Sequence, residues 1–169
     1  MSDRDALIEP HIPALRRYAW ALCRRSAHDA DDLVQDCLLR ALARWHLRRT
    51  DGSVRAWLFA ILHNQFVTLC RKEMRRPKLA TFDEADGPET DAAQPHAAYL
   101  SDVAAALDTL PDDQRAVLLL VGVEDLSYEE AAHSLGIPVG TVMSRLSRGR
   151  ERLRQVMDGH RSVALRRVK

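Results

Sequence analysis

One polar, proline-rich segment divides this chain of 169 residues into two parts, and it limits the possible folds more than any other feature. Three prolines recur among acidic and small side chains in residues 77–98, the only long stretch without a helical repeat of apolar residues. Such a stretch is too polar to be buried, and its prolines interrupt helices. We therefore predict an all-α protein with two small helical domains, at 1–77 and 99–169, joined by a flexible acidic linker at 78–98.

Three helices are expected before the linker, because apolar residues recur there at intervals of three and four. The first two are predicted at Pro13–Arg25 and at Asp29–Trp45, with Asp29 interpreted as an N-cap. The third is predicted from just after Ser53 to Arg76, where the following proline ends it. Its inner face is expected to consist of Leu58, Ile61, Leu62, Gln65 and Leu69.

The second part of the chain shows a helix-turn-helix pattern. Ser127 and Glu130 have the spacing of a capping box, and Gly136 is placed to end that helix with a left-handed cap. A short glycine-containing turn between two helices is typical of a DNA-binding helix-turn-helix. The other helices of this part are predicted at Asp102–Thr109, from Pro111 onward, and from after Pro138 to about Met157.

Basic residues are concentrated at the two ends of the chain. The net charge of +1 comprises +6 in residues 1–78, −12 in residues 79–138 and +7 in residues 139–169. Two separated basic blocks indicate two surfaces that face polyanions. Five arginines lie on the last predicted helix, where they suit phosphate and guanine contacts: Arg145, Arg148, Arg150, Arg152 and Arg154. A merely solvated arginine-rich helix is the alternative interpretation.

Several motifs in the same order resemble an extracytoplasmic-function (ECF) sigma factor of the sigma-70 superfamily, and the resemblance covers nearly the whole chain outside the linker and the termini. The motifs of the first part are Asp31-Asp-Leu-Val-Gln-Asp36 with Leu38-Leu-Arg-Ala41, and Arg55-Ala-Trp-Leu-Phe-Ala-Ile-Leu-His-Asn64. Those of the second part are Leu110-Pro-Asp-Asp-Gln-Arg115, Leu126-Ser-Tyr-Glu-Glu-Ala-Ala132 and Pro138-Val-Gly-Thr-Val142 with Ser144-Arg-Leu146.

The resemblance implies that the second predicted helix docks on core RNA polymerase, at the β′ clamp helices, with the β subunit as a further contact. The residues that match this surface are Asp32, Leu33, Gln35, Asp36 and Arg40. Acids on such a surface would pair with polymerase arginines, and Leu33 would contribute burial. Acids near a helix start also serve as caps, so Gln35 and Asp36 are the stronger interface candidates.

The resemblance also implies that the third helix, with the loop His46–Ser53 before it, reads and melts the promoter −10 element. The residues implied in this role are Arg55, Trp57, Ile61, Asn64 and Gln65, followed by a phosphate-binding end at Arg71, Lys72, Arg75, Arg76 and Lys78. Melting requires a stacking wall and an amide that can bond the edge of an unstacked base. Asn64 is the best candidate for that amide, and a hydrogen bond within its own helix is the alternative.

The helix-turn-helix matches the module that binds the −35 element as duplex DNA. The residues implied there are Gly140, Thr141, Ser144, Arg145, Ser147, Arg148 and Arg150. Many members of the family have Arg or Lys at the position of Met143 and an aromatic residue at that of Ser147, so Arg145 and Arg148 are the more secure contacts.

The segment Leu118–Gly122 followed by Tyr128–Ala132 resembles the EcfG-like general-stress group. That resemblance implies a small anti-sigma factor that clamps the two domains together and hides both functional surfaces. For the acidic linker two interpretations stay open: it threads the polymerase channel as a nucleic-acid mimic, or it is a solvated tether.

Other classes of protein fit the sequence less well. The seven histidines are scattered and no phosphate-binding glycine loop is present, so neither an enzyme nor a metal or cofactor site is expected. An ordinary helix-turn-helix regulator would leave residues 31–76 without a role. A redox sensor would need reactive thiols, but the three cysteines occupy mostly apolar helix positions. The longest apolar run, Ala116–Val123, is too short to span a membrane, and a cytoplasmic location is expected.

Overall fold

The structure is a computed structural model, and it describes residues 3–24, 26–49, 51–75 and 95–166. Helices form nearly all of this described part, and no strand occurs in it, which confirms the prediction of an all-α protein with two domains. The α helices of the N-terminal domain are α1 (Asp3–Ile8), α2 (Ile12–Leu22), α3 (Ala27–Ala43) and α4 (Val54–Arg75). Those of the C-terminal domain are α5 (Pro95–Asp108), α6 (Asp112–Leu118), α7 (Tyr128–Leu135) and α8 (Val139–Arg166). The shorter helical turns are η1 (Glu9–His11), η2 (Trp45–Leu47) and the π-helical turn η3 (Leu119–Val123).

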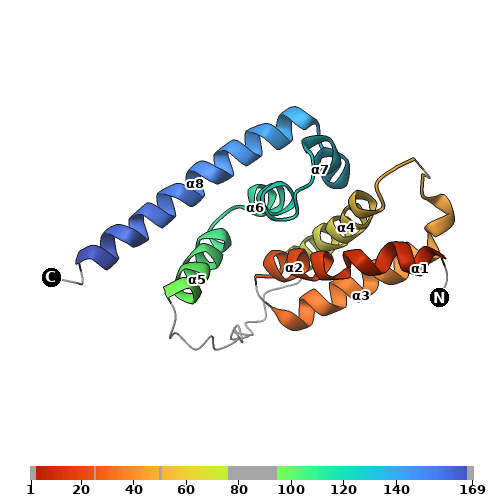
Figure 1. The fold of residues 1–169 in the computed structure, drawn as a ribbon, viewed down its shortest axis with the longest axis horizontal. Helices are drawn as coiled ribbons and strands as arrows, with labels where there is room; N and C mark the ends of the chain where they lie inside the picture. Colours follow the sequence, from red (N-terminus) through yellow and green to blue (C-terminus); the bar gives the residue numbers. More distant parts are fainter. Residues whose placement is uncertain (1–2, 25, 50, 76–94, 167–169) are drawn as a thin grey trace.

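The N-terminal domain is built on α2, α3 and α4, which pack around one apolar core (Figure 1). Tyr18 of α2 and Phe59 of α4 are fully buried and meet edge to face, with ring centroids 5.3 Å apart. Aromatic pairs of this geometry add to the stability gained by burial alone. Cys37 of α3 is also buried and donates from its Sγ to the carbonyl of Leu58 at 3.5 Å.

Several boundaries differ from the sequence prediction. The N-cap of α3 is Ser26 and not Asp29: the Ser26 hydroxyl accepts a hydrogen bond from the Asp29 amide at 3.4 Å. Ser26, three residues before Asp29, satisfies the free amides at the start of α3 in place of Asp29. The acids near this helix start had favoured Asp29 in the sequence prediction. Helix α1 was not predicted, and α5 begins at Pro95, inside the segment interpreted as the linker. Helix α8 continues to Arg166, well past the predicted end at Met157.

The start and end of α7 are as predicted. Ser127 and Glu130 form a reciprocal capping box, in which the Glu130 amide donates to the Ser127 hydroxyl at 3.1 Å and the Ser127 amide donates to the Glu130 carboxylate at 3.0 Å. Gly136 ends the helix with φ of 64°, the left-handed conformation that glycine adopts without steric cost. Helix α8 begins three residues later and crosses α7, which gives the helix-turn-helix (Figure 1).

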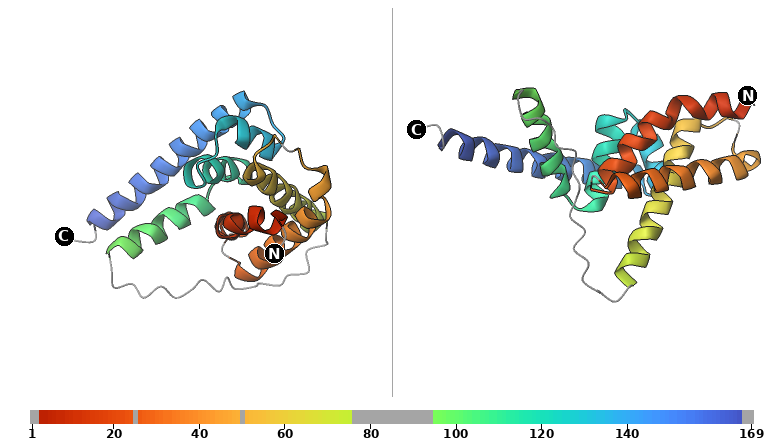
Figure 2. Two further views of the ribbon diagram at one scale, coloured as in Figure 1. Left: turned by 45° about the vertical axis from the view of Figure 1, so that its right-hand side comes forward. Right: turned by 90° about the horizontal axis from the view of Figure 1, so that it is seen from below.

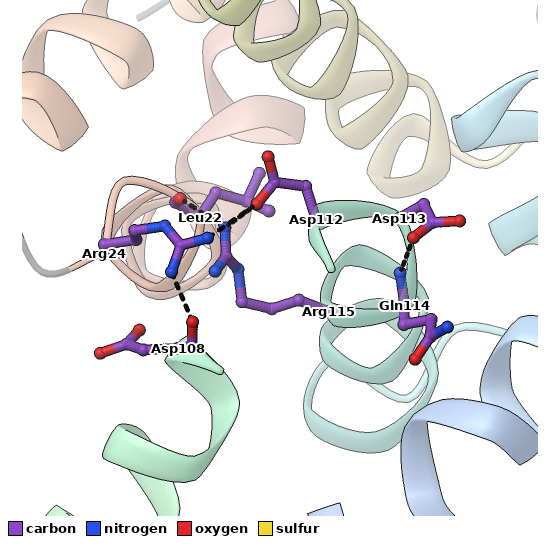
Figure 3. Close-up of polar contacts among 7 residues, drawn as sticks. All are labelled: Leu22, Arg24, Asp108, Asp112, Asp113, Gln114 and Arg115. Carbon is purple, nitrogen blue, oxygen red and sulfur yellow. Dashed lines mark hydrogen bonds and ion pairs between the residues drawn. The ribbon is translucent and has the colours of Figure 1, made fainter. Parts of the chain in front are cut away.

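The two domains pack directly against each other. Figures 1 and 2 show α6 and α7 lying beside α2 and α4, and contacts among these helices join the domains. Arg115 of α6 is fully buried and donates to the carbonyl of Leu22 at 3.2 Å and to the carboxylate of Asp112 at 2.6 Å (Figure 3). Arg24 reaches from the end of α2 to Asp112, at 3.3 Å, and to the carbonyl of Asp108 (Figure 3).

Among the helices that the structure describes, none is both long and apolar enough to cross a bilayer.

Candidate functional site

The exposed face of α3 carries four of the five residues assigned to polymerase binding. These four are Asp32, Gln35, Asp36 and Arg40, in which Asp32 is followed by Gln35 and Asp36 at three and four residues and Asp36 by Arg40 at four, and all four are exposed. Side chains at such spacing lie along one side of a helix. The structure therefore gathers these polar groups on a single solvent-facing surface.

Leu33 is the fifth residue of that set, and the structure places it in the core instead. Only 2% of Leu33 is exposed, so it packs within the N-terminal domain and offers no apolar surface to a partner. Leu39 takes that place on the exposed side of α3, where 65% of its surface is exposed. The helical periodicity around the buried residues Leu33, Val34 and Cys37 could have identified Leu39 as outward-facing.

Helix α4 presents Asn64 and a basic end to solvent. The side chain of Asn64 is exposed, and within the described residues its amide makes no hydrogen bond, so the alternative of a bond within the helix finds no support. Arg71, Lys72 and Arg75 are exposed along the last turns of α4. Arg76 and Lys78, assigned to the same basic end, lie outside the described residues.

Other residues assigned to the −10 element are less accessible in this conformation. Ile61 and Trp57 are half-buried, and Trp57 meets Trp45 edge to face at 5.9 Å between ring centroids. Gln65 is 5% exposed, and neither polar atom of its amide has a hydrogen-bond partner among the described residues. Gln65 was predicted both on the inner face of the helix and at the DNA surface, and only the inner position agrees with its burial.

The start of α8 presents most of the residues assigned to the −35 element. Gly140, Ser144, Ser147, Arg148 and Arg150 are exposed and Thr141 is half-buried. Arg148 folds back along its helix and donates to the Ser144 carbonyl at 3.2 Å. Arg145 is only 28% exposed and pairs with Asp113 of α6 at 3.1 Å. Within the described residues neither Arg148 nor Arg150 forms an ion pair, whereas Arg145 first has to leave Asp113 to reach DNA.

His63 lies one residue before Asn64 in a hydrophobic environment. Burial, followed by the positive charge of Arg145, lowers the pKa of His63 to about 4, so the imidazole is neutral at pH 7. Burial also raises the pKa of Tyr18 far above its usual value. The protonated Tyr18 hydroxyl and Nδ1 of the neutral His63 form a hydrogen bond of 3.1 Å.

The low pKa of His63 predicts a pH dependence of stability. The unfolded chain, in which the histidine pKa is 6.5, takes up a proton that the folded chain does not bind until about pH 4. The free energy of unfolding should therefore fall as the pH drops below 6.5, by about 2 kcal/mol between pH 7 and pH 5. Urea unfolding at a series of pH values measures this loss. The H63Q variant should not show this loss of unfolding free energy at low pH, whereas H46Q, which replaces an exposed histidine, should still show it.

The three cysteines are not poised for redox chemistry. Burial raises the pKa of Cys23 and that of Cys37 to about 12, and it also raises the pKa of Cys70. Because the thiolate is the reactive form, a raised pKa makes these thiols less reactive at neutral pH than an ordinary cysteine.

Family models match both domains. The model of the sigma2 domain of PhyR matches residues 8–63, and the model of sigma-70 region 4 matches residues 100–153. The first match contains α3 and the start of α4, and the second contains the helix-turn-helix.

Whole-chain comparisons agree with the family models. The chain is 41% identical over 152 residues to the ECF RNA polymerase sigma factor EcfG of Rhodopseudomonas palustris, a match that covers 90% of this chain and 83% of that protein. Among solved structures it resembles the sigma factor RpoE in complex with the anti-sigma factor NepR from Bartonella quintana, with a TM-score of 0.76, 32% identity and coverage of 94% and 98%. It also resembles CnrH in complex with the cytosolic domain of CnrY, with a TM-score of 0.69, 29% identity and coverage of 91% and 86%. The chain therefore belongs to the ECF family of RNA polymerase sigma factors.

Proposed function

We propose that this chain binds core RNA polymerase through the exposed face of α3 and directs it to promoters with −10 and −35 elements. The observation that carries the proposal is the placement of three surfaces on one chain: the polar face of α3, Asn64 with the basic end of α4, and the arginine-rich start of α8. A chain that only bound duplex operators would use the last of these alone.

The −10 element would be melted and read along α4. An unstacked base needs an aromatic wall and a group that bonds its edge, and both lie near the start and middle of this helix. Trp57 and Trp45 supply the aromatic surface, and the free amide of Asn64 both donates and accepts. Arg71, Lys72 and Arg75 would then hold the DNA backbone, with an affinity that falls as salt rises.

The −35 element would be read as duplex DNA by the first turns of α8. Residues near the start of a recognition helix meet base edges, and later ones meet phosphates. Arg148 has the fork of N–H donors that binds guanine O6 and N7 in the major groove. Met143 and Ser147, which are exposed on the same helix, would set the preferred sequence apart from that of relatives with basic and aromatic residues there.

We further infer control by an anti-sigma factor within a general stress response. The support is the likeness to EcfG and to two sigma factors that were solved in complexes, RpoE with the anti-sigma factor NepR and CnrH with the cytosolic domain of CnrY. Members of this family are transcription factors that act with RNA polymerase, which supports a cytoplasmic, non-enzymatic role for this chain.

Run-off transcription with purified core polymerase and a genomic promoter library tests the proposal. Enriched start sites should share −35 and −10 boxes at a fixed spacing. R148A should weaken the preference for the −35 box about tenfold, since a bidentate contact to a base contributes about 1–3 kcal/mol of discrimination. N64A should relax the −10 preference by a similar factor.

R154A is the matched control for R148A. It removes the same charge from the same helix, but Arg154 is paired with Glu151 at 2.7 Å and is not among the assigned −35 residues. The control should keep the −35 preference. Binding of a duplex operator without polymerase, together with unchanged start sites when the chain is added, would instead favour an ordinary helix-turn-helix regulator.

A further inference from the structure

The acid Glu124, in the C-terminal domain, is buried against two arginines of the N-terminal domain. Only 1% of its side chain is exposed. Arg17 of α2 donates to both carboxylate oxygens, from Nε at 3.1 Å and from Nη2 at 2.9 Å. Arg55 of α4 donates from Nη2 to the second oxygen at 3.1 Å. One carboxylate therefore accepts three charged hydrogen bonds across the domain interface, and such bonds are among the strongest in proteins.

The backbone around Glu124 holds this carboxylate in place. The amide of Glu124 donates to the Leu119 carbonyl at 2.9 Å, closing the π-helical turn η3. Asp125 follows with φ of 51°, a left-handed conformation that is uncommon for residues other than glycine. The amide of Leu126 then donates to the Leu120 carbonyl at 3.0 Å. Irregular turns of this kind are frequent at functional sites.

The contact continues along the first turns of α4. The buried hydroxyl of Ser134 in α7 donates to the carbonyl of Ala56, the residue after Arg55, at 2.9 Å. A cavity of about 520 Å³ lies beside it, lined by Arg48 and Trp57 of the N-terminal domain and by Glu129 and His133 of α7. The C-terminal domain thus lies over the part of α4 that carries Arg55 and Trp57.

A guanidinium binds a phosphate and a carboxylate through the same paired N–H donors, so the N–H group of Arg55 that holds Glu124 is not available to DNA. We propose that Glu124 is an internal competitor of promoter DNA. In the free chain the Glu124 carboxylate binds Arg55 and holds the C-terminal domain over α4, the helix proposed to read the −10 element. The ligand that this contact excludes is the DNA phosphate backbone. This inference rests on the proposed role of Arg55 at the −10 element.

DNA binding by the free chain tests the competition. E124Q keeps the size of the side chain and one acceptor oxygen but removes the charge. It should bind a short fluorescein-labelled single-stranded oligonucleotide about tenfold more tightly than the wild type, because the closed state loses its paired charge. E9Q, which removes an exposed acid from the N-terminal domain, is the matched control and should leave the affinity unchanged. In an R55A background E124Q should give a smaller gain, since no Arg55 remains to be released.

Small-angle X-ray scattering of the same free proteins tests the closure without DNA. E124Q should have a larger radius of gyration than the wild type and E9Q. R17Q gives a second test if E124Q fails to fold, because it leaves Glu124 charged but removes its bidentate partner. R17Q should shift the affinity and the radius in the same direction as E124Q, with a smaller gain of about threefold in affinity.

Equal radii and equal DNA affinities for the wild type and the folded variants would overturn the proposal, as would a gain from E124Q that is equally large without Arg55. These measurements need neither polymerase nor a defined promoter. If run-off transcription shows promoter selection while E124Q and R17Q behave as the wild type, the proposed competition by Glu124 is wrong and the proposed function stands. If E124Q opens the chain but no promoter selection occurs, the closure is supported and the proposed function fails.

Discussion

The D36K variant is expected to bind core RNA polymerase about a hundredfold more weakly than the wild type. Asp36 is exposed on the polar face of α3, and none of the described residues forms an ion pair with it. Reversing its charge would place a cation against the polymerase arginines that the acid is proposed to meet, and such like-charge contacts cost several kcal/mol. A hundredfold loss corresponds to about 2.7 kcal/mol. Fluorescence anisotropy of the labelled chain titrated with core polymerase measures the loss.

The same exposure makes D36K suitable as a test of the interface. Within the described part of the chain the variant breaks no side-chain hydrogen bond or ion pair, so it should unfold at the same urea concentration as the wild type. D102K is the matched control: it makes the same change at an exposed residue of α5, in the other domain. D102K should bind polymerase normally. Equal polymerase binding by D36K and D102K would remove the face of α3 from the proposed interface.

Leu39 extends this argument to the apolar part of the interface. The resemblance to sigma factors assigned that role to Leu33, but a motif match does not say which side of the helix faces the core. The structure shows Leu33 buried and Leu39 exposed, on the same side of α3 as Gln35 and Asp36. An apolar residue in such a setting is typical of the centre of a binding surface.

The parts of the fold that were predictable depend on local rules. The capping box of Ser127 and Glu130 and the left-handed Gly136 follow from backbone groups within four residues, so the sequence alone identified the ends of α7. The same rules were insufficient at α3, where Ser26 and Asp29 both qualify as caps and only the geometry decides between them.

The packing of one domain on the other could not be predicted in this way. Glu124 is separated from Arg55 by 69 residues and from Arg17 by 107 residues, and no local pattern relates them. The motif that contains Arg115 does not indicate a partner for it, yet Arg115 is buried against the end of α2. Contacts at such separation depend on how the complete surfaces fit together.

The inner face of α4 shows the same limit, and it gives the second large prediction. Helical spacing placed Leu69 inside and did not single out Phe59, whereas the structure buries Phe59 completely and leaves Leu69 exposed. F59A would remove a fully buried ring and its edge-to-face contact with Tyr18 at 5.3 Å. The free energy of unfolding should fall by about 3–5 kcal/mol, which urea denaturation followed by circular dichroism measures.

L69A is the matched test on the same helix. If Leu69 lay on the inner face, as the spacing suggested, its loss would cost about 2–5 kcal/mol, whereas an exposed residue should cost no more than about 0.5 kcal/mol. A small effect of L69A beside a large effect of F59A would fix the rotation of α4 about its axis. That rotation decides which residues meet DNA, because the orientation of α4 about its axis that buries Phe59 also directs Asn64 to solvent. Comparable losses in the two variants would mean that α4 is rotated from this orientation, and the −10 assignments would have to change with it.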